Sequence, residues 1–265
     1  MRTRVGPYTI VRRIGGGGQG QVFLGHDTRL QRQVAIKTYR LPDARQARRE
    51  TLREARRLAG IRDPRVVQVH DVVESSDYLA LVMEYVPGCN LEELLAATRL
   101  SLPGVLRVAT DLTAAIAAAR RQRLVHGDLK ASNVLVSREG RALLTDFGIA
   151  RTARDLRTPL RSGSLEALAP EQLRGDPLDV RTDLFALGRL LFRLLTQQHA
   201  FSRAGLPSAA AVLEGEPVSV REHLPVSDTT PDALCDLVDQ LLRREPAERP
   251  ADTHPVRQVL RDVMR

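Results

Sequence analysis

The chain has 265 residues, 43% of them hydrophobic, which is enough to bury a large core as one domain or as two lobes. Aromatic residues make up only 3% and tryptophan is absent, so the core has to consist mainly of Leu, Val, Ile and Ala. The net charge of +8 would allow an acidic partner such as nucleic acid. The 40 basic residues are interspersed with 32 acidic ones, however, which favours a solvated mixed surface and argues against nucleic acid as a partner.

The cysteines and the N-terminus indicate the compartment. Cys89 and Cys235 lie far apart without metal-ligand spacing, which fits a reduced compartment and no disulfide framework. The first ten residues lack the apolar core of a signal peptide, and no run approaches the roughly 18 apolar residues of a membrane helix. We expect a cytoplasmic protein with no membrane segment within this chain.

The first predicted strand, residues 8–14, runs into a glycine-rich turn at residues 15–20, and a second strand-like stretch follows. Glycines let backbone amides approach phosphates closely. Dinucleotide-binding folds use similar glycine spacing, but there a helix follows the glycines. The pattern therefore favours a hairpin loop that folds over a nucleotide, with Val22 against the base.

A buried strand is predicted at residues 34–37, ending in Lys37. Only Lys37 and Lys130 are lysines among the 40 basic residues, so arginine serves wherever a generic positive charge suffices. A lysine ammonium is a compact point charge that reaches a single phosphate oxygen, where a guanidinium fork would not fit. The sequence therefore places lysine where an ammonium is needed.

A helix is predicted over residues 43–59. Six arginines on it could mark a nucleic-acid-binding face: Arg45, Arg48, Arg49, Arg53, Arg56 and Arg57. We favour a solvated surface, because the inward stripe of this helix carries an acid, Glu54. Glu54 is placed to pair with Lys37, and Glu50, one turn earlier on the same face, is the competing candidate.

Two more strands are predicted at residues 66–73 and 78–85, and Pro87 with Gly88 then breaks the sheet. This break predicts a lobe boundary, with one lobe at residues 1–86 and the other at 87–265.

The connector between these lobes is a candidate site for an adenine edge. Backbone groups of Glu84 and Val86 would bind that edge, and Met83 would limit the depth of the pocket. Asn90, with Glu93 three residues later, predicts a capped helix start.

The stretch that carries most chemistry is HGDLKASNVLV, residues 126–136, which follows a buried helix predicted over 101–121. Asp128 could accept a proton from a hydroxyl, Lys130 could neutralise a transferring phosphoryl group, and Asn133 could offer its amide oxygen to a divalent metal. His126, between an apolar residue and a glycine, is interpreted as a packed structural residue rather than a base.

A second acid, Asp146, follows a second apolar run and would complete a Mg²⁺ site with Asn133. Each acid alone could be a turn residue that closes a hairpin. Both motifs in this order make that alternative unlikely and predict phosphoryl transfer.

The polar segment from Asp146 to Glu171 fits either a mobile substrate-facing segment or an ordinary surface loop. Asp183, near the start of an apolar helix at 181–195, could bind backbone amides of the catalytic loop. Arg249 is a candidate buried partner of Glu171 through a bidentate pair.

Taken together, these motifs resemble the eukaryotic-type protein kinases over nearly the whole chain, and most of all the bacterial serine/threonine kinases. The matching segments are IGGGGQGQVF, VAIK, REA around Glu54, MEYV, HGDLKASN, DFG, APE and RTDLFALG, with Arg249 near the end. The resemblance implies an α+β, bilobal protein kinase fold with a small antiparallel β-sheet N-lobe, one helix on it, and a larger, mainly helical C-lobe.

The resemblance also implies a serine/threonine protein kinase that uses ATP and Mg²⁺, with Mn²⁺ as a possible substitute, and that autophosphorylates. The catalytic residues would be Asp128, Lys130, Lys37 and Glu54, and the metal ligands would be Asn133 and Asp146. The ATP contacts would be Ile14, Gly15, Gly17, Gly20, Val22, Ala35, Lys37, Met83, Glu84, Val86 and Leu135. Protein substrates, a cognate phosphatase and phosphothreonine-reading domains are the implied partners.

Two departures from the family pattern matter. Gly127 replaces the arginine with which many kinases hold a phosphorylated activation segment, so we expect activity without obligatory phosphorylation at Thr152, Thr158 or Ser162. Ser164 stands where the family places a residue near the acceptor. Ala167 replaces a tyrosine usual in that loop, which bears on substrate docking.

Three other functions compete. Aminoglycoside or choline phosphotransferases also carry an HGD loop but typically lack the following lysine and the APE element, present here as Lys130 and residues 169–171. A pseudokinase scaffold usually lacks one of Lys37, Asp128 and Asp146, and all three are present. A nucleic-acid binder would show steep salt-dependent affinity.

Overall fold

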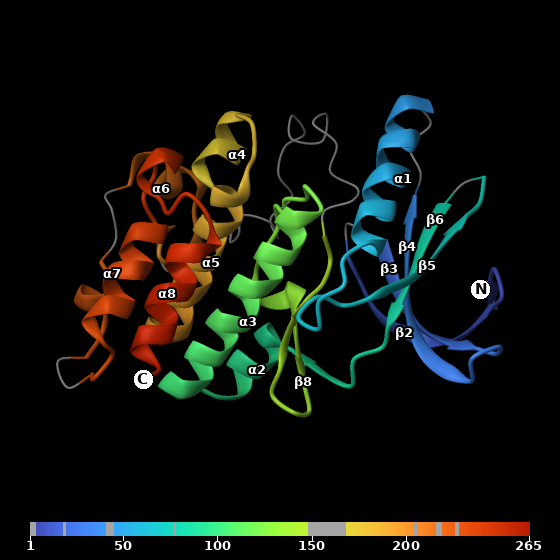
Figure 1. Cartoon of the computed structure of the whole chain (residues 1–265), viewed down its shortest axis with the longest axis horizontal. Coiled ribbons are helices and arrows are strands. Elements are labelled where there is room, and N and C mark those ends of the chain that lie inside the picture. Colours follow the sequence, from blue (N-terminus) through green and yellow to red (C-terminus); the bar gives the residue numbers. More distant parts are fainter. Residues whose placement is uncertain are drawn as a thin grey trace.

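The structure is a computed structural model that describes residues 4–17, 20–40, 45–76, 78–147, 168–203, 206–215, 219–225 and 228–265. A β-sheet with one helix beside it forms the N-lobe, and a mainly helical C-lobe follows it (Figure 1). The α+β protein kinase architecture expected from the sequence is therefore confirmed.

The N-lobe sheet has six strands in the order β1-β2-β3-β4-β6-β5, and every neighbouring pair is antiparallel. The strands are β1 (Arg4–Val5), β2 (Tyr8–Gly17), β3 (Gly20–Asp27), β4 (Arg32–Arg40), β5 (Val69–Glu74) and β6 (Tyr78–Glu84). The glycine-rich segment closes the β2–β3 hairpin, where Gly17 pairs with Gly20, so a strand follows the glycines as predicted. The strand expected from residue 66 begins only at Val69, because Val66 forms an isolated parallel bridge with Leu144 instead.

Strand β6 shows how the sheet is buried on both faces. Leu79, Leu81 and Met83 belong to the main hydrophobic core, which continues into the C-lobe. Ala80 and Val82 belong to a second cluster within the N-lobe. Successive side chains of a strand point to opposite faces, so β6 needs apolar residues at every position.

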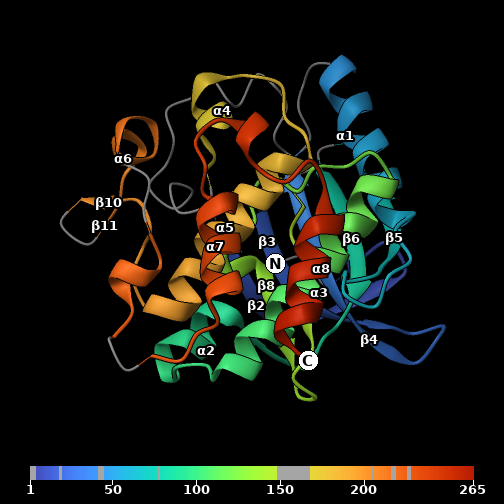
Figure 2. The ribbon, with the colours of Figure 1, turned by 60° about the vertical axis from the view of Figure 1, so that its left-hand side comes forward.

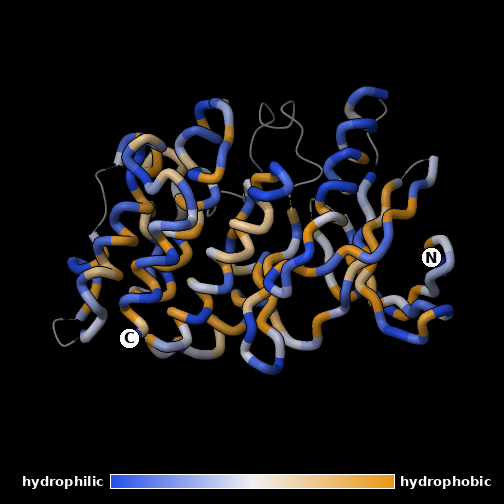
Figure 3. Tube along the Cα trace, viewed as in Figure 1, coloured by the Kyte–Doolittle hydropathy of each residue, from blue (hydrophilic) through white to orange (hydrophobic). Residues whose placement is uncertain are grey.

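Helix α1 (Arg45–Ala59) contacts β5, and its buried face carries Thr51, Ala55 and Leu58. Figure 3 shows the helix as hydrophilic along most of its length. Its exposed arginines share the opposite face: Arg45, Arg49, Arg53, Arg56 and Arg57. Arg48 instead pairs with Glu74 on β5 at 2.8 Å.

The C-lobe begins with strand β7 (Gly88–Asn90) and helix α2 (Leu91–Ala97), whose start carries the predicted capping box between Asn90 and Glu93. Strand β7 pairs with β8 (Val134–Ser137), which pairs with β9 (Ala142–Leu144). The longer helices are α3 (Leu102–Arg121), α5 (Val180–Thr196), α7 (Asp232–Leu241) and α8 (Thr253–Val263). Shorter elements are α4 (Pro170–Arg174), α6 (Ala209–Glu214), β10 (Ser202–Arg203), β11 (Leu206–Pro207), and 3₁₀ turns at Ala131–Asn133, Arg221–His223 and Pro246–Glu248.

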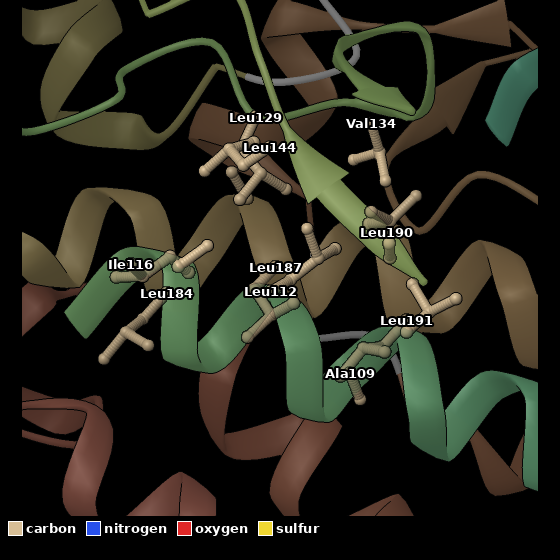
Figure 4. Close-up of a cluster of buried hydrophobic side chains, with 14 of the residues drawn as sticks. Ala109, Leu112, Ile116, Leu129, Val134, Leu144, Leu184, Leu187, Leu190 and Leu191 are labelled. Atoms are coloured by element: carbon tan, nitrogen blue, oxygen red, sulfur yellow. The ribbon is translucent and has the colours of Figure 1, made fainter. Parts of the chain in front are cut away.

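Helices α3, α5, α7 and α8 lie side by side in both ribbon views (Figures 1 and 2) and contact one another. Figure 4 shows how α3 and α5 meet beneath the segments that carry the catalytic loop. The labelled side chains are Ala109, Leu112, Ile116, Leu129, Val134, Leu144, Leu184, Leu187, Leu190 and Leu191. This core is built from aliphatic residues, as the composition requires.

Helix α3 is long and apolar enough to span a membrane by length and composition alone, so the expectation that no such stretch exists was too strict. More than half of the relevant window is buried inside the protein. A central core helix has this composition without any contact to lipid.

Candidate functional site

The catalytic loop is anchored to helix α5 by a single buried carboxylate. Asp183 accepts the backbone N–H of His126 at 2.8 Å on Oδ2 and that of Gly127 at 2.9 Å on Oδ1. Burial raises the pKa of Asp183, although His126 and the two amides lower it in part. The predicted contact between Asp183 and the loop amides is confirmed.

His126 is a structural residue, as predicted. It is 1% exposed, its Nδ1 accepts the backbone N–H of Asp128 at 3.2 Å, and its Nε2 lies 2.8 Å from the Thr145 carbonyl. With Nδ1 as an acceptor, Nε2 carries the proton and donates it to Thr145. The ring also packs against Phe147 with centroids 4.6 Å apart, so His126 ties the catalytic loop to the segment after β9.

Asp128, Lys130 and Asn133 form one contact group on the loop. The Lys130 ammonium lies 3.1 Å from Oδ2 of Asp128, and the Asn133 amide nitrogen donates to the Asp128 carbonyl at 2.7 Å and to Oδ2 at 3.2 Å. Asp128 itself is fully buried. These contacts fix the carboxylate and leave the Asn133 amide oxygen as the atom for a cation.

Asp146 follows β9 in a left-handed conformation with φ of 62°. The backbone N–H of the preceding Thr145 donates to the Asn133 carbonyl at 3.0 Å, so Asn133 and Asp146 are brought to the same place by adjoining segments. An amide oxygen and a carboxylate are hard oxygen donors, and Mg²⁺ is commonly held by one or two such ligands with water and phosphate completing its shell. The two residues therefore fit a magnesium ion.

The predicted pairing of Lys37 with a glutamate of α1 is wrong for this structure. Lys37 is 3% exposed, and its ammonium lies 2.9 Å from the Asp146 carboxylate. In the described part of the chain, Glu54 forms no hydrogen bond or ion pair, and Glu50 is exposed and accepts from Gln46. Burial raises the pKa of Glu54 to about 7, with Arg57 lowering it and Glu50 raising it. Helical spacing correctly predicted that Glu54 lies on the inward face of α1. It carries no information on how far α1 lies from β4.

The residues expected around a nucleotide lie on adjoining strands. Val22 is the register partner of Lys37 across β3 and β4, and Ala35 is that of Met83 across β4 and β6. Apolar residues of the proposed lining retain solvent access: Ile14, Val22, Ala35 and Leu135. Gly15, Gly17 and Gly20 lie on the two strands of the β2–β3 hairpin.

In the connector between the two lobes, the backbone groups of Glu84 and Val86 differ in their hydrogen bonding. The Glu84 N–H donates to the Gln68 carbonyl at 2.9 Å, so this N–H is already engaged. The backbone N–H and carbonyl of Val86 have no hydrogen-bond partner among the residues that the structure describes. A donor and an acceptor of this kind suit the edge of an adenine ring.

Two residues near the site were missed by the sequence analysis. Tyr39 is 4% exposed, and its ring centroid lies 5.3 Å from the Lys37 ammonium, where burial and Asp146 raise its pKa well above the usual value. The signal was present, because residues two apart on a strand share a face. Gln172 donates to the Gly127 carbonyl at 2.8 Å and so connects α4 with the catalytic loop.

Glu171 and Arg249 form the predicted buried bidentate pair, with two contacts of 2.8 and 2.9 Å. Thr182 also donates to Glu171 at 2.9 Å. The remaining expectations for this region fall on Gly148, Thr152, Thr158, Ser162, Ser164 and Ala167, which lie outside the described residues.

Known proteins with similar sequences are protein kinases, and the similarity covers most of the chain. The sequence model of the protein kinase domain matches residues 8–262. A probable serine/threonine-protein kinase of Streptomyces coelicolor is 39% identical over 212 residues, which cover 74% of this chain and 31% of that protein. Serine/threonine-protein kinase PrkC of Bacillus subtilis is 34% identical over 252 residues, 92% of this chain and 38% of that protein.

A third relative, probable serine/threonine-protein kinase PknB of Lactococcus lactis, is 33% identical over 265 residues, 97% of this chain and 41% of that protein. The matched region thus spans between 31% and 41% of the length of these curated relatives. Because the family match covers nearly every described element, from β2 to α8, the chain belongs to the protein kinase domain family.

Proposed function

We propose that the chain is an ATP-dependent serine/threonine protein kinase, which transfers the γ-phosphate of ATP to Ser or Thr hydroxyls of proteins, its own among them. One observation carries the proposal. Lys37 of the N-lobe pairs with Asp146, the neighbouring Thr145 N–H donates to the Asn133 carbonyl, and Asn133 and Lys130 both contact Asp128, so these contacts join the two lobes. The relatives named above are serine/threonine kinases, which supports the same assignment.

The protein's residues would divide the chemistry as follows. Asp128 accepts the hydroxyl proton of the substrate, and Lys130, 3.1 Å from it, neutralises charge that develops on the transferring group. Asn133 and Asp146 would hold Mg²⁺, with Mn²⁺ as a substitute, and Lys37 would contact the phosphates. ATP bound with this metal supplies the phosphoryl group.

Glu54 has a role in this proposal that needs a movement of α1. When Asp146 holds a metal ion, its carboxylate no longer balances Lys37, and the half-buried Glu54 on the inward face of α1 is the proposed replacement. The nucleotide would lie between lobes comprising residues 1–86 and 87–265, against the apolar residues and connector described above. Cytoplasmic location, a cognate phosphatase and phosphothreonine-reading partners belong to the same proposal.

Structural features favour this function over a small-molecule phosphotransferase. Lys130 lies in direct contact with Asp128, and Glu171 of the APE element forms a buried ion pair with Arg249. The experiment is incubation with labelled ATP and Mg²⁺, with wild type beside Asp128→Asn and Lys37→Met. Labelled phosphoserine or phosphothreonine on the protein or a generic substrate, lost in both variants, is expected. Phosphorylation of aminoglycosides or choline alone would refute the proposal.

A further inference from the structure

The exposed face of helix α1 carries a row of four arginines: Arg45, Arg49, Arg53 and Arg56. They follow one another at intervals of four, four and three residues, and such intervals keep side chains on one face of a helix. All four residues are exposed. Both ribbon views show α1 at the border of the molecule, so this arginine row faces solvent (Figures 1 and 2).

The charge of the arginine row is not balanced by the acids of its own helix. Among the residues that the structure describes, no member of the row forms a hydrogen bond or an ion pair. Of the two acids on α1, Glu50 accepts from Gln46, and the half-buried Glu54 is influenced by the charge of Arg57, which lies outside the row. Four positive charges are therefore left on this face.

Other arginines near the surface do have acidic partners. Arg48, on the flank of the same helix, lies 2.8 Å from a Glu74 oxygen on β5. Arg120 at the end of α3 lies 3.1 Å from an Asp252 oxygen at the start of α8. The unpaired row is therefore a local feature of α1 and does not simply follow from the arginine-rich composition.

The arginine row does not help α1 to fold. Like charges four residues apart on a helix repel one another, and Arg45 with Arg49 and Arg49 with Arg53 are two such pairs. The first turn of α1 contains no acid, although acids are favoured at a helix N-terminus, and it begins with Arg45 instead. A bound chain of negative charges would remove both unfavourable effects.

We propose that the arginine row is a docking surface for an extended acidic segment of a partner protein, with a carboxylate on every second residue. Successive arginines of the row are about 6, 6 and 4.5 Å apart along the helix axis. Side chains on one side of an extended chain repeat about every 6.6–6.8 Å. The two spacings differ by only about 1–2 Å, which long arginine side chains can absorb. An acidic segment also repels itself and so stays extended.

The composition of this face separates an acidic protein segment from other anionic partners. A helix that binds a membrane surface needs apolar residues beside its cations, but Ala55 and Leu58 of α1 are buried inside the protein. Single-stranded nucleic acid is bound by aromatic stacking as well as by charge, and α1 contains no aromatic residue. A carboxylate requires neither, because a guanidinium group binds it through two parallel hydrogen bonds.

The test measures the binding of fluorescently labelled peptides to the whole chain by fluorescence anisotropy, without ATP. One peptide alternates Glu and Ala, a second has the same composition with all Glu residues in one block, and a third replaces each Glu of the alternating peptide by Gln. We expect the alternating peptide to bind about threefold more tightly than the block peptide and at least about tenfold more tightly than the Gln peptide. Its affinity should fall as salt is added, because the contacts lie at the surface.

Two double variants separate the arginine row from net charge. Arg49→Gln with Arg53→Gln removes half of the row and should weaken the binding of the alternating peptide about tenfold. The matched control is Arg257→Gln with Arg261→Gln on the exposed face of α8, which removes the same charge at the same spacing and should leave Kd within about twofold. All four positions are exposed, so both variants should keep a Tm close to that of the wild type.

Four results would overturn the proposal. Equal loss of binding in both double variants would show that the peptide responds only to net charge. Equal affinity for the Glu and Gln peptides would show that carboxylates are not recognised, and equal affinity for the alternating and block peptides would reject the extended arrangement. Tighter binding of an oligo(dT) strand, a DNA duplex or phosphatidylserine vesicles, lost in Arg49→Gln with Arg53→Gln, would assign the row to phosphate groups instead. Because ATP is absent, each result is independent of the proposed kinase function.

Discussion

The Lys37 ammonium lies 2.9 Å from the Asp146 carboxylate, so the buried cation of the N-lobe sheet is balanced by the acid that follows β9. This pair crosses from one lobe to the other. It also joins a residue proposed to bind phosphate to a residue proposed to bind the metal ion. Without nucleotide, each of the two groups therefore satisfies the charge of the other.

This arrangement predicts that nucleotide stabilisation depends on Lys37. Mg²⁺ with ATP at about 100 times Kd should stabilise the wild type by about 2.7 kcal/mol, seen as a rise in Tm. Lys37→Met removes the ammonium and should lose most of that rise. Asp128→Asn keeps Lys37 and Asp146, so it should retain the rise although it lacks the proposed base. Equal shifts in wild type and Lys37→Met would show that the ammonium does not contact the nucleotide.

The raised pKa of Glu54 predicts that the free energy of unfolding depends on pH. Its pKa of about 7 lies above the ordinary 4.5, so the folded protein binds this proton more tightly than the unfolded chain. The contribution of this pKa difference to the free energy of unfolding is fully present below about pH 4.5. It is lost as the pH rises through 7. Glu54→Gln does not titrate, so its advantage over wild type should grow between pH 5 and pH 8 to about 2–3 kcal/mol, measured by urea unfolding.

The matched control is Glu50→Gln, one turn earlier and exposed, which should change stability by less than about 0.5 kcal/mol at every pH. A constant difference between Glu54→Gln and wild type across this range would contradict the prediction. Catalytic activity should change in the opposite direction to stability. If α1 must bring Glu54 to Lys37 for catalysis, Glu54→Gln should lower kcat while it stabilises the protein.

Features set by neighbouring residues in the chain were predictable from the sequence. The Asn90 capping box and the glycine hairpin follow from local spacing, and both are present. Two long-range contacts, Asp183 with the loop amides and Glu171 with Arg249, could also be anticipated, because a buried charge needs a specific partner.

The features that could not be predicted depend on how whole helices and strands are placed relative to one another. The partner of Lys37 is decided by the distance of α1 from β4, and side-chain periodicity within α1 carries no information on that distance. The late start of β5 has a similar cause, since Val66 pairs with Leu144 from a segment far along the chain.

The pair of Glu171 with Arg249 predicts a large stability effect. The Arg249 side chain has no exposed surface and that of Glu171 is 4% exposed. Burial raises the pKa of Glu171, but the hydrogen bonds and charge of Arg249 outweigh it and hold the pKa below the usual value. Arg249→Met leaves a buried carboxylate without its cation and should cost roughly 3–5 kcal/mol in the free energy of unfolding.

The second variant for this pair is Glu171→Gln combined with Arg249→Met. It has no unpaired charge, so it should be clearly more stable than Arg249→Met alone in chemical denaturation. A double variant as unstable as the single one would mean that the loss comes from packing of the arginine stem, for example against the Phe185 ring 4.6 Å away.

Gly127 predicts that activity does not require a phosphorylated activation segment. Its φ of 69° is a left-handed conformation that favours glycine, and an arginine in this place would be strained. Because Gly127 has no cationic side chain to bind a phosphate group, the joint replacement of Thr152, Thr158 and Ser162 by alanine should keep most of the kcat on a generic substrate. A collapse of kcat to the level of Asp128→Asn would reject this view.

Gly188 of α5 predicts a close approach of two helices that admits no side chain. A Cβ atom at this position would lie 2.7 Å from the Cβ of Leu241 and 3.3 Å from its carbonyl carbon. Gly188→Ala should therefore push α5 and α7 apart and cost roughly 1–3 kcal/mol, despite the better helix propensity of alanine. Gly104 of α3 is the matched control, because its added Cβ would meet no atom closer than 3.6 Å. Gly104→Ala should stabilise the protein by up to about 1 kcal/mol, so the two variants should move the urea midpoint in opposite directions.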